Sequence, residues 1–70
     1  MKVKYYKYTT QIHKFVHYFE VFQLGGVVQY NVIRIIDNNI KKEFNKQCNG
    51  SFFKVCQKIS KNEWDKVNEL

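Results

Sequence analysis

The chain has no proline, no alanine and only three glycines, and its acidic residues number six against twelve lysines and arginines. Without alanine it lacks the best helix former, whereas its many Val, Ile, Phe, Tyr and Thr residues suit a pleated, half-buried surface. These absences predict a protein that is mostly β-sheet. A length of 70 residues allows one small domain, 1–70. Such a chain buries only about 60% of its unfolded surface, so its core has little stability to spare. We therefore expect a homodimer, because self-association is the simplest way to bury more surface.

Long apolar runs are also missing. The longest uncharged stretch, 21–33, is 13 residues long and contains glutamine and asparagine, so it is too short and too polar to span a bilayer. Lysines interrupt the start of the chain, and we expect no signal peptide and no membrane partner. With only two cysteines, the sequence predicts reduced thiols and a cytoplasmic location.

Recognisable catalytic motifs are lacking as well. Gly25-Gly26 has neither the further glycines nor the Lys-Ser/Thr pair of a phosphate-binding loop. Nothing resembles a nucleophile elbow, and six acidic residues leave little material for an acid–base pair. We therefore expect no enzyme and no cofactor.

Metal ligation is not predicted either. Seven residues separate Cys48 from Cys56, unlike the closely spaced pairs of structural zinc sites, and in the hairpin expected below they point to opposite faces. His13 and His17 lie four apart, a spacing that offers two imidazoles to one metal only on a helix. Ordinary sheet histidines and half-buried, unpaired thiols are the simpler reading.

Three turn signals divide the chain: Gly25-Gly26, residues 37–39 and Asn49-Gly50. Gly-Gly and Asn-Gly tolerate the positive φ values of tight hairpin turns. The spacing predicts an α+β, mostly β protein, built on an antiparallel meander of four to five strands at 2–8, 13–24, 27–36, 40–48 and 51–59.

Assumed turn lengths give a testable register. A two-residue turn at Gly25-Gly26 sets Val21 opposite Tyr30 and Phe19 opposite Val32. A three-residue loop at 37–39 then places Val32 beside Phe44, and a turn at Asn49-Gly50 pairs residues 40–48 with 51–59. One face of the sheet becomes apolar, with Phe15, Phe19, Val21, Val28, Tyr30, Val32, Ile36, Ile40, Phe44, Phe53, Val55 and Ile59.

The end of the chain predicts a helix. Ser60 followed by Glu63 fits a capping box, and a helix over 61–69 places Trp64 and Val67 on one side. We expect that side to pack on the apolar sheet face. Residues 10–24 leave an alternative open, because their apolar positions also fit a helical stripe, which gives the order β-α-β-β-β-α.

The same registers place His17, Arg34 and Lys42 in one row across the apolar face, where they are candidates for anion binding. The row depends on the length of the loop at 37–39. We expect a two-residue loop there to set Arg34 opposite Glu43 instead, as a cross-strand ion pair.

Basic and aromatic residues are interleaved in two segments, residues 2–8 and 52–58. The formal charge of the chain is +6. Aromatic rings stack on unpaired bases while lysines neutralise phosphates, which is how sheet surfaces bind single strands. The predicted nucleic-acid or partner-binding residues are Lys4, Tyr6, Tyr18, Phe22, Lys41, Phe52, Lys54 and Lys58.

The central hairpin is apolar on its second side too. Phe22, Ile33 and Ile35 face away from the predicted core, and an exposed patch of that kind marks a contact surface for a protein partner or a second copy.

The sequence thus predicts a small, basic, non-enzymatic binding protein that engages nucleic acid or a nucleoprotein complex. The alternative is a protein–protein inhibitor or adaptor that antagonises a host enzyme or defence complex. Half of the residues are Lys, Asn, Ile, Tyr or Phe, whose codons are rich in A and T, which suggests a phage or another mobile element as the source.

Overall fold

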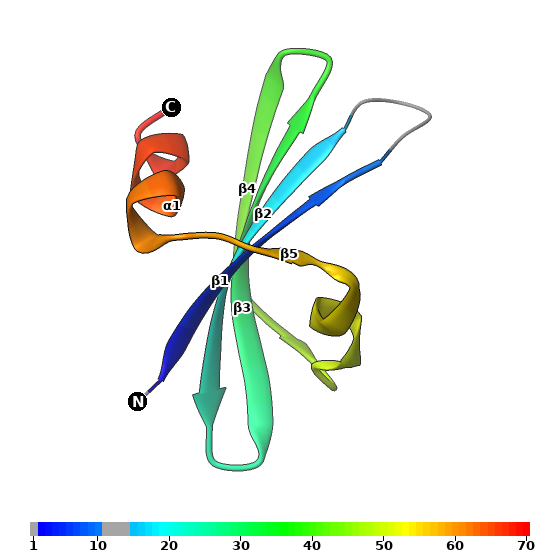
Figure 1. Ribbon diagram of the computed structural model, residues 1–70, viewed down its shortest axis with the longest axis vertical. Coiled ribbons are helices and arrows are strands. Elements are labelled where there is room, and N and C mark those ends of the chain that lie inside the picture. The colour runs from blue at the N-terminus through cyan, green and yellow to red at the C-terminus, as the bar shows by residue number, and fades with distance from the viewer. Residues whose placement is uncertain (1, 11–14) are drawn as a thin grey trace.

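The computed structural model describes residues 2–10 and 15–70. Five strands form one antiparallel sheet in the order β4-β3-β2-β1-β5, which confirms the predicted mostly β meander with a C-terminal helix (Figure 1). The elements are β1 (Val3–Thr9), β2 (Val16–Leu24), β3 (Val27–Ile36), β4 (Asn39–Cys48), the 3-10 helix η1 (Ser51–Val55), β5 (Gln57–Lys58) and the helix α1 (Lys61–Asn68).

The segment that fitted both a strand and a helix is strand β2. It lies in the middle of the sheet and pairs with β1 on one side and with β3 on the other. Its alternating aromatic and β-branched residues then contact both faces of the sheet, which a helix in this position could not do. The helical alternative is therefore wrong for Val16–Leu24; its earlier part, with His13, lies outside the described residues.

The first hairpin turn is the one that the sequence predicts. Gly25 has φ 62°, a value that glycine adopts at little cost. The two-residue turn sets Val21 opposite Tyr30 and Phe19 opposite Val32, as expected.

The second turn is one residue shorter than the three-residue loop expected at 37–39. Asp37 and Asn38 have φ values of 50° and 67°, and both residue types tolerate this left-handed region. Ile36 therefore pairs with Asn39, and Val32 lies opposite Glu43 rather than Phe44. The predicted register of β4 is wrong, and Phe44 is 53% exposed instead of part of the core.

An irregularity in β4 shifts its register again. Val32 is opposite Glu43, but Tyr30 is opposite Lys46, so one extra residue of β4 lies between the two pairs. Asn45 has φ 61° there, and its backbone N–H donates to Asn31 Oδ1 at 3.0 Å. This bulge turns Lys46 toward the face that carries Tyr30.

The third turn signal does not form a hairpin. Gly50, at φ 84°, instead begins η1, while Asn49 Oδ1 accepts hydrogen bonds from the backbone N–H and the hydroxyl of Ser51. The chain then continues to β5, which pairs with β1 and not with β4. The predicted strand 51–59 is wrong, because Asn-Gly serves equally well where a short helix begins with a left-handed glycine.

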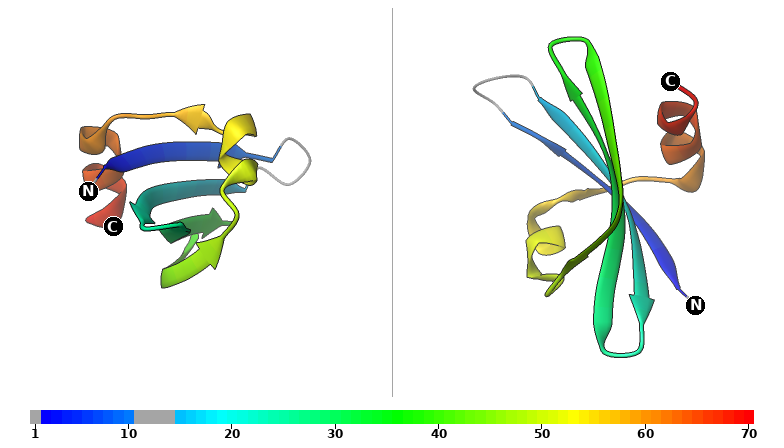
Figure 2. Two further views of the ribbon diagram at one scale, coloured as in Figure 1. Left: turned by 90° about the horizontal axis from the view of Figure 1, so that it is seen from below. Right: turned by 180° about the vertical axis from the view of Figure 1, so that it is seen from behind.

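The sheet is covered on both faces. The strand β5 follows the edge of β1, and η1 and α1 lie on opposite sides of the sheet (Figures 1 and 2). We name the faces after these elements. The η1 face has a core of Phe19, Val32 and Phe53, and the α1 face has a core of Ile33, Trp64 and Val67.

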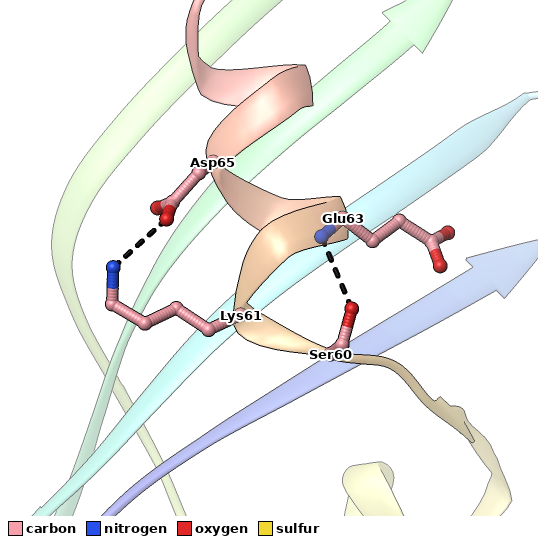
Figure 3. A network of polar contacts seen from close by, with 4 residues as sticks. All are labelled: Ser60, Lys61, Glu63 and Asp65. Carbon is pink, nitrogen blue, oxygen red and sulfur yellow. Dashed lines mark hydrogen bonds and ion pairs between the residues drawn. The ribbon is translucent and has the colours of Figure 1, made fainter.

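The helix α1 begins as predicted but covers the other face. Ser60 Oγ accepts a hydrogen bond from the backbone N–H of Glu63 at 3.2 Å (Figure 3). Trp64 is 2% exposed and packs against Ile33, not against the Phe19 cluster where the sequence placed it. The passage of β5 along the edge of the sheet explains the difference, since it carries the chain from one face to the other.

The helix covers two of the three residues of the predicted contact surface on the second side of the hairpin. Ile33 is fully buried, and Ile35 and Phe22 are half-buried. The expectation of an exposed interface is therefore wrong for Ile33 and Ile35, because residues 59–67 pack over them within the same chain.

Candidate functional site

The charges of the protein are divided between the two faces. Opposed residues of adjacent strands share a face, so the register assigns each charged strand residue to one side. The cations on the η1 face, with η1 and β5, are Lys2, Lys4, Arg34, Lys41, Lys46, Lys54 and Lys58. Among the described strand residues, the carboxylate on this face is Glu43, and Asp37 lies in the turn between β3 and β4.

Cations and anions on the α1 face balance each other. The lysines are Lys7, Lys42, Lys61 and Lys66, and the acids are Glu20, Glu63, Asp65 and Glu69. Lys61 Nζ lies 2.8 Å from Asp65 Oδ2 (Figure 3). Lys7 Nζ lies 3.9 Å from Glu63 Oε2, and Lys7 also sits over the ring of Tyr18. The positive charge of the described chain therefore belongs to the η1 face.

An aromatic pocket of about 300 Å³ opens on the η1 face. Phe19 and Phe53 are its buried residues, at 6% and 7% exposure, whereas Phe52 at the rim is 44% exposed. We call this site the aromatic pocket; its lining is Tyr8, His17, Phe19, Tyr30, Arg34, Cys48, Phe52 and Phe53.

The rings of the pocket support one another. Phe19 contacts Phe53 edge-on at a centroid distance of 5.3 Å, and Tyr30 contacts Phe53 in the same way at 5.6 Å. Phe52 packs against Phe19 at 5.6 Å and against Tyr8 at 5.5 Å. The 3-10 helix η1 therefore supplies two adjacent rings, one of which fills the core while the other stands at the opening.

His17 and Arg34 supply the polar groups of the pocket. They are opposed across β2 and β3, so the prediction that they lie side by side is confirmed. Burial, and then the positive charge of Arg34, lowers the pKa of His17 below its ordinary value of 6.5. The imidazole is uncharged at neutral pH, and it offers one hydrogen-bond donor and one acceptor rather than a charge.

Arg34 also forms the predicted ion pair with Glu43. The two are not directly opposed, however, since Arg34 faces Lys41 and Glu43 faces Val32. The hydrogen bond from Arg34 lowers the pKa of Glu43 below its ordinary value of 4.5. Glu43 therefore stays ionised at neutral pH and fixes the guanidinium beside the pocket.

Lys42 does not belong to this group. It is opposite Ile33 on the α1 face, and its Nζ donates to the backbone carbonyl of Asn68 at 2.8 Å. The predicted row of His17, Arg34 and Lys42 is thus wrong in its third member, because the shorter turn puts Lys41 in that place.

A second pocket of about 300 Å³ lies on the same face and shares Phe53 with the first. We call it the lysine pocket; it is lined by Lys2, Lys4, Tyr6, Val21, Gln23, Val28, Gly50 and Phe53. At Gly50 a Cβ atom would lie 3.2 Å from Val28 Cγ2, so glycine lets η1 start close to the sheet.

The structure brings together six of the eight predicted binding residues. Lys4, Tyr6, Lys41, Phe52, Lys54 and Lys58 lie on or around the η1 face. Tyr18 and Phe22 lie on the α1 face, with Tyr18 packed against the Trp64 core, so their assignment to the same surface is wrong.

Sequence reasoning missed Lys2, Tyr8, Tyr30 and Lys46. The alternation of Lys2, Lys4, Tyr6 and Tyr8 carried the signal for the first strand, because residues two apart share a face of a strand. Lys46 could not have been assigned, since it reaches this face only through the bulge in β4.

Both cysteines pack against the core of the η1 face, so the expectation that they point to opposite faces is wrong. Both are free thiols, and burial raises the pKa of Cys56. The described residues contain no group of three or more His, Cys, Asp and Glu side chains placed to hold a metal ion. Within residues 2–10 and 15–70, no helix has the length and apolar character needed to cross a membrane.

Comparisons with known proteins gave no match to this chain among protein-family models, curated proteins or solved structures.

Proposed function

We propose that the protein is a non-enzymatic cytoplasmic binding protein that engages nucleic acid through its η1 face. The observation that carries the proposal is the separation of charge: exposed lysines share the η1 face with the aromatic pocket, while the lysines of the α1 face are matched in number by carboxylates. A surface of one sign around an aromatic site fits a polyanion whose own rings can be stacked.

The phosphate backbone is the first part of the ligand that this surface would meet. Lysines that neutralise phosphates release condensed counterions, so the affinity should fall steeply as the salt concentration rises. Lys41, Lys46, Lys54 and Lys58 are all exposed. Their long side chains can contact the phosphates of a nucleic-acid backbone in more than one position.

A binding role also fits the polar groups beside the pocket. Glu43 is the carboxylate closest to them in the register, and it is held ionised by Arg34 rather than kept protonated as a general acid. The thiol of Cys56 has a raised pKa, which makes it a poor nucleophile. We therefore assign these groups to positioning and recognition.

Charge reversal on the two faces tests the proposal. The pair Lys54→Glu and Lys58→Glu removes two cations from the η1 side, and the pair Lys61→Glu and Lys66→Glu makes the same charge change on α1. Binding to labelled single- and double-stranded RNA and DNA, titrated at low and near-physiological salt, should weaken by about tenfold or more with the first pair. Equal losses from both pairs would show that only the net charge matters and would contradict an assigned face.

A protein partner is the second candidate, as for an inhibitor or adaptor of phage or mobile-element origin that antagonises a host enzyme or defence complex. What favours it is β4, an edge strand ten residues long that pairs with β3 on one side. Ile40 and Phe44 on this strand are 43% and 53% exposed. An added strand from another protein could pair there. A Phe44→Asp variant that loses a captured protein but keeps nucleic-acid affinity would favour this function.

A further inference from the structure

We infer that the aromatic pocket receives one unstacked base, so that the ligand of the η1 face is a single strand rather than a duplex. The inference rests on the proposed function and names the form of nucleic acid that this same site would take. Lysines alone would serve a duplex equally well, because every phosphate backbone presents the same charge. The pocket is the feature that separates the two ligands.

The pocket has the size and the chemistry of a site for a small planar ring. Its volume of about 300 Å³ lies at the lower end of the range for small-ligand sites. Six of its eight lining residues are aromatic in the broad sense that includes histidine, namely Tyr8, His17, Phe19, Tyr30, Phe52 and Phe53. Base–aromatic stacking is tolerant of sequence because every base has a π face.

The rings at the opening fix how a base would enter. Phe52 and Tyr8 already touch at 5.5 Å between centroids, and Tyr8 and His17 at 6.2 Å. A base therefore does not slide between two of these rings. It stacks on Phe52, the most exposed ring of the pocket, above the buried rings of Phe19 and Phe53.

Two polar groups can meet the edge of that base. The guanidinium of Arg34 donates hydrogen bonds, and the uncharged imidazole of His17 both donates and accepts. Each of the four bases carries an acceptor next to an N–H donor on its pairing edge. These edges are free in a single strand and occupied in a duplex, so the pocket favours unpaired bases without selecting one of them.

The cations flank the pocket as a backbone path requires. Lys41 is opposite Arg34 on one side, and on the other side Phe53 separates the aromatic pocket from Lys2 and Lys4 of the lysine pocket. A strand that leaves its base in the aromatic pocket can continue over Phe53 with its phosphates near these lysines. The two pockets together therefore suit a ligand of at least two linked nucleotides.

The experiment compares two oligonucleotides of equal charge. The protein is titrated separately with a short uniform single strand of DNA and with the same strand in which abasic sites replace the bases. The matching duplex is the third ligand. Stacking contributes about 1–3 kcal/mol per base, so the normal strand should bind the wild-type protein at least about fivefold more tightly than the abasic strand. Phe52→Ala should abolish this difference, Phe52→Trp should keep it, and Val55→Ala, on the same 3-10 helix at a residue that is 69% exposed, should not change it.

The outcomes separate this inference from the proposed function. If the abasic strand binds as tightly as the normal strand, the pocket holds no base, and if the duplex does so, the ligand is not restricted to a single strand. Either result overturns the inference, while nucleic-acid binding itself stands. If none of the three ligands binds at low salt, both fail, and the pocket is left to an aromatic side chain of a protein partner. Circular dichroism of Phe52→Ala checks that the loss is not caused by unfolding.

Discussion

Arg34 and Glu43 are ion-paired across the β3–β4 hairpin although neither lies directly opposite the other. Lys41 takes the place opposite Arg34, and Val32 the place opposite Glu43. The diagonal pair holds the guanidinium of Arg34 at the aromatic pocket. Because the turn at Asp37-Asn38 has two residues rather than three, Lys41 and Glu43 lie on the η1 face with Arg34. The length of this turn thus determines both the ion pair and the charge of the η1 face.

The ion pair predicts an acid-dependent loss of stability. The pKa of Glu43 is lower in the folded protein than its ordinary value of 4.5, so its contribution is complete above that pH and is lost as the pH falls through the folded pKa. Glu43→Gln should lower the melting temperature at neutral pH. The difference in melting temperature between this variant and the wild type should become smaller below pH 4.5. Thermal denaturation across this range measures it, with Glu69→Gln at the end of α1 as the control.

His17 should titrate below its ordinary value. Because its pKa is lowered in the folded state, the contribution to stability is present above pH 6.5 and is lost as the pH falls through the folded pKa. Arg34→Gln should raise this pKa only in part, since burial is the larger cause. NMR titration of the imidazole, assigned with His17→Gln, gives both values; a wild-type pKa at or above 6.5 would contradict the described burial.

The core on the α1 face should be sensitive to cavities. Ile33 is 0% exposed and packs with Trp64, so Ile33→Ala should lower the free energy of unfolding by about 2–5 kcal/mol. Ile40→Ala, at a residue 43% exposed on the edge strand, should cost less than about 1 kcal/mol. Urea denaturation of both variants measures this difference. Similar losses from the two would mean that α1 does not cover this face.

The start of η1 should depend on glycine. Gly50→Ala forces a side chain into the left-handed region at φ 84° and brings its Cβ to 3.2 Å from Val28 Cγ2, so it should cost about 1–2 kcal/mol. Gly26→Ala is the matched control, because no atom lies within 4 Å of a Cβ there and its φ is not positive. If Gly50→Ala also weakens nucleic-acid binding at low temperature, where it remains folded, the position of η1 contributes to the site.

The sequence predicted the local features of the fold better than its long-range pairings. The Gly25-Gly26 turn and the Ser60 cap follow from short-range preferences that no distant contact overrides. Asn49-Gly50 is different, because the same dipeptide fits a hairpin or the start of η1. Only the partner of the next strand decides between them, and that partner, β1, lies far away in the sequence.

The candidate site was predictable to a similar extent. The sequence singled out Lys4 and Tyr6 of β1, which do share the η1 face, and Phe52 was recognised from its basic neighbours. The pocket itself was not foreseen, because it exists only where η1 folds back over the sheet. The bulge at Asn45 likewise brings Lys46 to the site by a shift that periodicity cannot show.

The most direct test of the account is to map the surface that contacts nucleic acid. Isotope-labelled protein is titrated with a short single-stranded oligonucleotide while backbone and side-chain NMR signals are followed. We predict saturable shifts at Lys4, Lys41, Phe52 and Lys58, with little change along α1 (Lys61–Asn68). Shifts concentrated on α1, or no shifts at all at low salt, would contradict the assignment of the η1 face as the binding surface.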